Sequence, residues 1–228
     1  LAANSTVNVP LLTTLSTESV TLGNNSHFQA PALTRLRDAT VTLATDSVFQ
    51  APLVNDLQNT LLTLSPGATF TTAPLTNILN ARLAVQGGAT FNGLAPTTTS
   101  YTNNRAAHET IFSATGSSIL NLSSLTTLTM DKDAGYFKTI SATAGGQINL
   151  SGLTTLAVTP SNQTTLDFRM DTGGTIDLSH LQTIQPTAGV SNGRHRFYFE
   201  ANHTYALPEL QSSQAAEFHL GASDVLDL

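Results

Sequence analysis

The sequence predicts an all-β fold built as a solenoid of stacked parallel strands, and two observations predict it. An apolar-x-apolar motif, usually followed by Pro or Ser and then Leu, returns along the whole chain at nearly constant spacing. A period of this size is typical of a solenoid, in which each repeat buries its apolar face by stacking on its neighbours. The chain is also rich in Thr and Ser, with only 11% charged residues, which suits short strands with a half-wet outer face.

The motif itself marks the first strand of each repeat. Its first apolar residue is found at Val7, Phe28, Phe49, Phe70, Phe91, Leu120, Ile148, Ile176, Tyr205 and Leu226. Subtraction of these positions gives intervals of 21, 21, 21, 21, 29, 28, 28, 29 and 21 residues. We expect the four Phe side chains of this column to point inward and to stack on one another.

A second strand lies upstream of the motif, because the residues eight and six positions before it are apolar in every repeat. The pairs run from Val20 and Leu22 through Phe168 and Met170 to Phe218 and Leu220. Phrases such as LTTL at Leu12 and LTRL at Leu33 supply a third inward-facing segment. The sequence therefore predicts a right-handed parallel β-helix of about ten coils of 21 to 29 residues, with three short strands per coil.

The repeat runs from end to end, so we expect a single domain over 1–228, cut from a longer chain. Residues 1–91 form bare 21-residue coils, 92–205 form enlarged coils, and 206–228 form a final short coil. The extra residues fall at one corner, in the stretches APTTTSYTNNRAAH, TMDKDAGY, AVTPSNQ and QPTAGVSNGR. We expect these insertions to stack into one protruding wall, and loops on a rigid scaffold often carry function.

Composition excludes several classes of function. A formal net charge of -6 provides no basic patch for nucleic acid. The chain has no cysteine, its histidines lack metal-ligand spacing, and no apolar run is long enough to span a bilayer. We expect no metal site, no cofactor and no membrane span.

The candidate site lies on outward positions of the upstream strand in the second half of the chain. These positions change from Thr and Ser to charged and aromatic residues, and residues that share a column lie on adjacent strands. Arg196 is expected between Asp167 and Glu217, and Arg169 beside Tyr198 and His219. The predicted ligand-binding residues are Asp167, Arg169, Asp171, Arg196, Tyr198, Glu200 and His219. A solvated salt-bridge ladder explains the same pattern without any ligand.

Three functions fit this pattern. The first is a non-catalytic module that binds a glycan or a cell-surface partner, since Arg, carboxylates and a Tyr ring suit sugar hydroxyls and acidic groups. The second is a polysaccharide lyase or glycoside hydrolase in which Asp171 and Glu200 act as paired carboxylates. The third is a structural spacer. No motif surrounds the two carboxylates, so the first interpretation is preferred and no catalytic residue is assigned.

Phrases such as GGQINLSGLTTL and GGTIDLSHLQTI, together with the period and the lack of cysteine, give the chain a family resemblance. The whole chain resembles the parallel β-helix repeats of exported bacterial surface proteins, the haemagglutinin-type adhesins and autotransporter passenger domains. This resemblance implies an extracellular or cell-surface rod used for adhesion, display or glycan contact, with neighbouring domains in a longer chain. It transfers no site residues.

A second resemblance competes for the fold. Phrases such as FQAPALTRL are similar to leucine-rich and receptor L-domain repeats. The coils contain no helix-forming stretch, and the sequence shows no regular Asn ladder, so this fold is the second choice.

Overall fold

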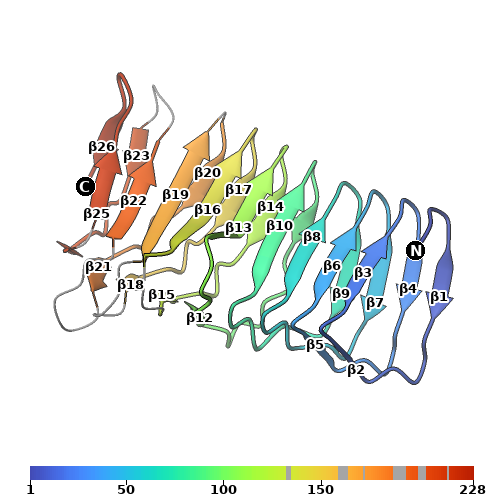
Figure 1. The fold of residues 1–228 in the computed structure, drawn as a ribbon. Helices are drawn as coiled ribbons and strands as arrows, with labels where there is room; N and C mark the ends of the chain where they lie inside the picture. Colours follow the sequence, from blue (N-terminus) through green and yellow to red (C-terminus); the bar gives the residue numbers. More distant parts are fainter. Residues whose placement is uncertain (132–134, 159–163, 172, 187–193, 200–203, 215) are drawn as a thin grey trace.

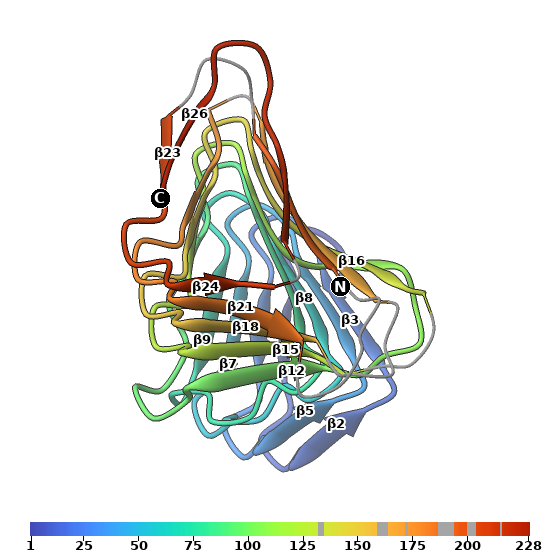
Figure 2. The same cartoon turned by 90° about the vertical axis from the view of Figure 1, so that its left-hand side faces the viewer.

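The structure, a computed structural model, describes residues 1–131, 135–158, 164–171, 173–186, 194–199, 204–214 and 216–228. Within these residues the protein is all-β, without a helix, and every strand pairing is parallel. Successive strands along the chain visit different sheets, which stack into an elongated body with the termini at opposite ends (Figure 1). Viewed along its length, the body has three sides (Figure 2). The architecture is consistent with a β-solenoid.

The first side is a continuous nine-stranded sheet, which we call the long sheet. Its strands are β3 (Ser19–Leu22), β6 (Thr40–Leu43), β8 (Leu61–Leu64), β10 (Arg82–Gln86), β13 (Glu109–Thr115), β16 (Phe137–Thr143), β19 (Thr165–Asp171), β22 (Arg194–Tyr198) and β25 (Ala216–His219). They are the upstream strands predicted from the sequence. Their register is also confirmed: Leu62 pairs with Leu83, Leu83 with Phe112, and Phe168 with Phe197.

The second side contains the strands of the recurring motif, in three separate sheets. The first sheet contains β1 (Thr6–Asn8), β4 (His27–Gln29), β7 (Val48–Ala51) and β9 (Thr69–Thr72). The second contains β11 (Thr90–Phe91), β14 (Ile119–Asn121), β17 (Gln147–Asn149) and β20 (Thr175–Asp177). The third contains β23 (Thr204–Ala206) and β26 (Val225–Asp227). This side is therefore interrupted twice, after β9 and after β20.

The third side is the least regular. It holds β2 (Thr14–Ser16) and β5 (Arg35–Arg37), and a five-stranded sheet of β12 (Ser100–Asn103), β15 (Thr127–Met130), β18 (Thr155–Val158), β21 (Thr183–Pro186) and β24 (Ser212–Ser213). Isolated bridges join Asp56 to Asn77 and Leu75 to Leu94 between these groups. The predicted third segment is thus present, although some of its copies are too irregular to form a strand.

The core runs through the middle of the body, between the three sides. The inward columns of the long sheet are almost completely buried, with Leu62, Phe112 and Phe168 at 1%, 0% and 0% exposure. Buried and partly exposed side chains alternate along β6 and β8, so the period of two read from the sequence is the burial pattern of these strands. One expected inward residue, Leu220, is instead exposed, because it follows the last strand of the sheet.

The predicted stack of Phe rings is only partly confirmed. The ring centroids of Phe28 and Phe49 lie 4.9 Å apart, and those of Phe49 and Phe70 lie 5.2 Å apart. Phe91 is buried but makes no ring contact with Phe70, because the second side is interrupted between them. The expectation that Phe91 continues the stack is wrong.

A short, irregular Asn ladder lies at one corner, between the third side and the long sheet, although the chain has no regular ladder along its length. There Asn59 Nδ2 donates to Asp38 Oδ1 (2.7 Å), and Asn80 Nδ2 donates to Asn59 Oδ1 (2.8 Å) and to Asn104 Oδ1 (2.7 Å). Asp38, Asn59 and Asn80 all have positive φ, between 52° and 57°, a conformation that Asp and Asn tolerate. The ladder is difficult to recognise in the sequence, because its first member is Asp38 and because Asn104 follows Asn80 by 24 residues instead of 21.

The enlarged coils differ from the bare coils in the length of their strands. β3, β6 and β8 have four residues each, whereas β13, β16 and β19 have seven. Part of the extra sequence therefore extends the long sheet and builds β12, β15, β18 and β21 on the third side. Within the first insertion, Tyr101 packs into the core, whereas Asn104, Ala106 and His108 are exposed. Residues 132–134, 159–163 and 187–193, which make up much of the predicted wall, lie outside the described residues.

Candidate functional site

The candidate site lies on the outer face of β19, β22 and β25. The strands bring Asp167, Arg196 and Glu217 into one column and Arg169, Tyr198 and His219 into the next. This is the register expected from the sequence. Of the other predicted residues, Asp171 is an exposed residue at the end of β19, and Glu200 lies outside the described residues.

Asp167 organises the polar part of this face. Its side chain is buried, and it accepts two hydrogen bonds from Arg196, at 2.7 Å to Nε and 2.9 Å to Nη2. It accepts a third bond of 2.9 Å from Arg169 Nη2. The bond from Arg196 to Asp167 raises the pKa of the guanidinium, against the opposing effect of burial. Bidentate charge-assisted bonds fix direction as well as distance, so one buried carboxylate positions two guanidinium groups.

The predicted ladder of acid, base and acid forms only in part. Arg196 contacts Asp167, but Glu217 forms its ion pair with Arg194, a residue that the sequence reasoning missed. Glu217 Oε2 also lies 3.6 Å from His219 Nε2. Arg194 precedes Arg196 by two residues and so lies on the same face of β22. This spacing is the sequence signal from which Arg194 could have been predicted.

Aromatic rings flank the two guanidinium groups. Arg169 Cζ lies 5.0 Å from the ring centroid of Tyr198, and Arg196 Cζ lies 5.5 Å from the same ring. Arg196 Cζ also lies 5.3 Å from the ring centroid of Phe137. The Tyr198 and His219 rings are stacked, 4.4 Å apart at 15°. Both distances to the Arg196 guanidinium fall within the range of cation–π attraction.

The aromatic strip continues beyond the predicted patch to the corner of the first insertion. Phe137 is 46% exposed, and its ring stacks on His108 at 5.2 Å. The Phe137 backbone N–H donates to His108 Nδ1 at 3.0 Å. Neither residue was predicted, although His108 ends the first insertion and Phe137 directly follows the second. We call the whole set the aromatic–arginine surface: His108, Phe137, Arg169, Arg196, Tyr198 and His219.

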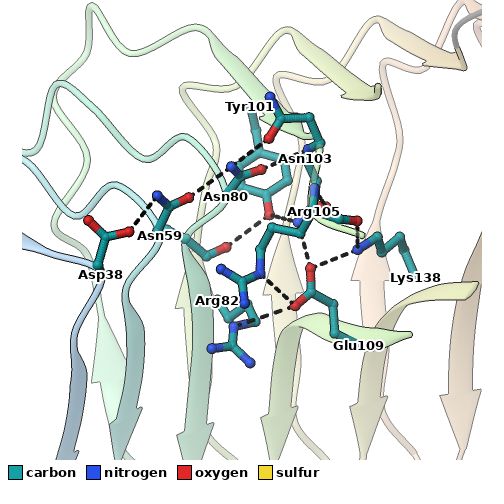
Figure 3. Close-up of polar contacts among 11 residues, drawn as sticks. Asp38, Asn59, Asn80, Arg82, Tyr101, Asn103, Arg105, Glu109 and Lys138 are labelled. Atoms are coloured by element: carbon teal, nitrogen blue, oxygen red, sulfur yellow. Dashed lines mark hydrogen bonds and ion pairs between the residues drawn. The ribbon is translucent and has the colours of Figure 1, made fainter. Parts of the chain in front are cut away.

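A second polar cluster lies beneath the start of the enlarged coils (Figure 3). Glu109 is its centre and accepts hydrogen bonds from Lys138 Nζ (2.8 Å), Asn103 Nδ2 (3.1 Å) and Arg105 Nε (3.1 Å). Arg82 Nε lies 3.6 Å from the same carboxylate. Three cations thus surround one carboxylate, and we call this group the Glu109 cluster. The sequence reasoning missed it, although Glu109 and Lys138 are one coil interval apart.

Burial and mutual contact shift the pKa values of Lys138 and Glu109 in the Glu109 cluster. The Lys138 side chain is completely buried, which lowers its pKa although the Glu109 hydrogen bond opposes the shift. Burial raises the pKa of Glu109, but the hydrogen bonds from Lys138 and Asn103 outweigh it and hold that pKa below its usual value. Glu109 is therefore ionised at neutral pH, and its carboxylate favours the charged form of Lys138. Because water does not solvate these buried groups, the charge of each is stabilised by its partner.

His195 occupies the same inward column, two strands beyond Lys138. Lys138 pairs with Leu166, and Leu166 pairs with His195. The imidazole is completely buried, and neither ring nitrogen has a hydrogen-bond partner. Burial lowers its pKa to about 3, so His195 is neutral in the folded protein. His195 therefore faces inward near the start of β22.

The described ranges contain neither a cluster of metal-ligating side chains nor a membrane-spanning helix. No group of three or more His, Asp or Glu side chains there is close enough to hold a metal ion. The same residues include no helix long and apolar enough to cross a membrane.

Comparison with known proteins provides no relative. No family model matches the chain, and no curated protein or solved structure matches it.

Proposed function

We propose that the chain is a non-catalytic binding module that holds a glycan or a cell-surface partner on the aromatic–arginine surface. One observation supports this proposal above the others: Asp167 is buried and positions Arg169 and Arg196, which leaves Arg169 half exposed beside the Tyr198 ring. A surface that served solubility alone would need neither the buried carboxylate nor the exposed ring of Phe137.

The chemistry of this surface suits a sugar. Aromatic faces offer apolar area to the C–H face of a sugar ring, and Tyr198 has a hydroxyl group at its edge. Guanidinium groups donate several hydrogen bonds in a fixed plane, which suits hydroxyl, carboxylate or sulfate oxygens. The surface extends from His108, which directly precedes β13, across β16, β19 and β22 to His219 on β25, so it suits an extended chain better than a single small molecule.

The location follows from the same proposal. A module of this kind belongs on the cell surface or outside the cell, as part of a surface or secreted protein. The resemblance of the repeat to adhesin-type repeats supports this location. Treatment of intact cells with an impermeant labelling reagent tests it, since a protein confined to the cell interior would remain unlabelled.

The binding site is tested with a glycan array and purified variants. We expect Arg169→Ala and Tyr198→Ala to weaken binding to the best array ligand by about tenfold or more, which is typical of residues central to an interface. Thr63→Ala is the matched control, because Thr63 lies in the same outward column of the long sheet, on β8. Unchanged affinity in both surface variants, with circular dichroism spectra like that of the wild type, contradicts the site.

The same ligands distinguish the other two functions. A lyase or hydrolase that uses Asp171 and Glu200 would release products from the bound polysaccharide and would lose this activity in Glu200→Gln. If the protein is a structural spacer, neither the wild type nor the Thr63→Ala control would bind a glycan or a component of a cell-surface extract.

For the fold, we propose a right-handed parallel β-helix of about ten coils over residues 1–228. Ten copies of the motif in the sequence support the coil number. Crossovers between parallel strands of one sheet are right-handed in nearly all proteins, which supports the hand. An experimental structure with a left-handed path between β6 and β8 would contradict it.

A further inference from the structure

The interruption between β9 and β11 leaves a cleft on the second side of the protein. The cleft has a volume of about 330 Å³ and is lined by β9, β11 and the turns that follow them, including Phe70, Thr72, Thr90 and Asn92. It lies on a different sheet from the aromatic–arginine surface. The Cα atoms of β9 and β11 are for the most part more than 8 Å apart, whereas paired strands lie about 4.8 Å apart.

A change of register opens the cleft. Phe70 and Phe91 are the equivalent motif residues, 21 positions apart by subtraction. Beyond the ends of both strands, Leu75 bridges to Leu94, which is a separation of only 19 positions. Because the register changes by two residues between these points, β9 and β11 cannot stay in one continuous ladder.

The walls of the cleft carry backbone groups that are paired at the equivalent places elsewhere. The residue before the motif donates its N–H to the previous strand, as Thr69 does to Ser47 O (2.8 Å) and Gln147 does to Ser118 O (2.8 Å). The residue two positions into the motif donates to the following strand, as Ala30 does to Gln50 O (2.9 Å). The equivalent bonds from Thr90 to Ala68 O and from Thr72 to Asn92 O are not formed.

The inner end of the cleft is apolar. Phe70 is partly exposed there, while Phe49 at the equivalent position one strand earlier is completely buried. An apolar side chain between the Phe70 and Phe91 rings would continue the column in which Phe49 and Phe70 stack. The cleft therefore presents two rows of backbone donors and acceptors and, between them, room for one apolar side chain.

We propose that this cleft binds an extended peptide of a partner protein, which adds a parallel strand beside β9. The peptide places one apolar or aromatic side chain inward, between Phe70 and Phe91, and polar side chains on either side of it. Its backbone N–H before that residue donates to Ala68 O, and its backbone carbonyl after it accepts from Thr72 N–H. An unpaired strand edge binds extended segments in this way, with the backbone giving affinity and the inward side chain giving specificity.

The probe is a synthetic peptide with the sequence GATFTTA, capped at both ends. This is the sequence of residues 67–73, which already stacks in the required register with one inward Phe. Two-dimensional NMR of the full chain should show saturable shifts of the Gly93 and Thr72 amides. A peptide N-methylated at the Thr before Phe loses the donor to Ala68 O, and we expect it to bind about fivefold more weakly.

Two variants test the wall formed by β9. Thr72→Pro removes the N–H that points into the cleft, so binding should weaken by about fivefold, whereas Thr72→Val keeps the N–H and should bind within about twofold of the wild type. If Thr72→Pro fails to fold, the N-methylated peptide on the wild-type protein provides the same comparison. Equal binding of the two peptides, or no amide shifts at millimolar peptide, overturns the proposal.

Occupation by a second copy of this chain is a separate outcome. Analytical ultracentrifugation of the wild type would then show a dimer that the peptide dissociates and that Thr72→Val retains. That result overturns the assignment to a partner protein, while a monomer that binds the peptide supports it.

Discussion

The bare coils and the enlarged coils contain the same inward columns but have different polar chemistry. In the bare half, the outward column of the long sheet reads Thr21, Thr42, Thr63 and Ala84. In the enlarged half, the same column continues through Ser141 to Arg169, Tyr198 and His219. The same continuous core thus supports small Thr and Ala side chains in this column of the bare half, and Arg, Tyr and His side chains in the enlarged half.

A second difference is the length of β13, β16 and β19, which have two more residues at the start and one more at the end than β6 and β8. Lengthening a strand adds positions on both faces, because successive side chains point to opposite sides. The new inward positions hold Glu109, Lys138 and Leu166, and the new outward position of β16 holds Phe137. The insertions therefore contribute to the candidate site through the strands as well as through loops.

The largest expected effect is on the Glu109 cluster, whose Lys138 is completely buried, whereas the Arg37 side chain that pairs with buried Asp56 in the bare half is 36% exposed. Glu109→Ala leaves Lys138 buried without its carboxylate, and loss of one partner from a buried pair costs about 3–5 kcal/mol. Denaturation by urea should show this loss in the free energy of unfolding. The double variant Glu109→Ala, Lys138→Met should recover most of it; a double variant as unstable as the single one would show that the charge is not the cause.

His195 makes the enlarged half sensitive to acid. Its pKa is about 6.5 when unfolded and about 3 when folded, so between these values the unfolded chain binds more protons and stability falls as the pH falls. Between pH 7 and pH 5 this loss amounts to about 2 kcal/mol. His195→Leu should remove that part of the pH dependence, as measured by thermal melts at both values. An unchanged slope would mean that other groups cause it.

The Asn ladder stabilises the corner of the bare half. Asn59→Ala removes its side-chain hydrogen bonds and places Ala at positive φ, which should cost about 1–3 kcal/mol. Asn59→Gly removes the same bonds but tolerates the backbone conformation, so the difference between the two variants measures the conformational part. Equal midpoints of urea denaturation for the two variants would show that the conformation contributes nothing.

The smallest expected effect on stability is that of Arg169, whose side chain is 53% exposed. Exposed ion pairs contribute little, so Arg169→Ala should change the free energy of unfolding by less than about 1 kcal/mol. A large loss of stability in urea denaturation would favour a structural role for the aromatic–arginine surface and weaken the proposal that it binds a ligand.

The register of the strands in the long sheet could be predicted from the sequence. The apolar pairs eight and six residues before the motif repeat in every coil, and a shift of one residue would turn all of them outward. For the same reason the columns of Asp167 with Arg196 and of Arg169 with Tyr198 were predictable. The contacts within the columns were not, because side chains as long as Arg reach over several neighbours: Glu217 pairs with Arg194, and Arg196 extends back to Phe137.

The amino-acid sequence by itself determined the repeat, the strands of the long sheet and the inward columns, because burial of an apolar column depends on period alone. Tertiary structure decided where the column breaks between Phe70 and Phe91, how Asn80 joins Asn59 to Asn104, and which cations surround Glu109. These features depend on the separation of groups from different coils. That separation is set by how the strands stack, and no single repeat encodes it.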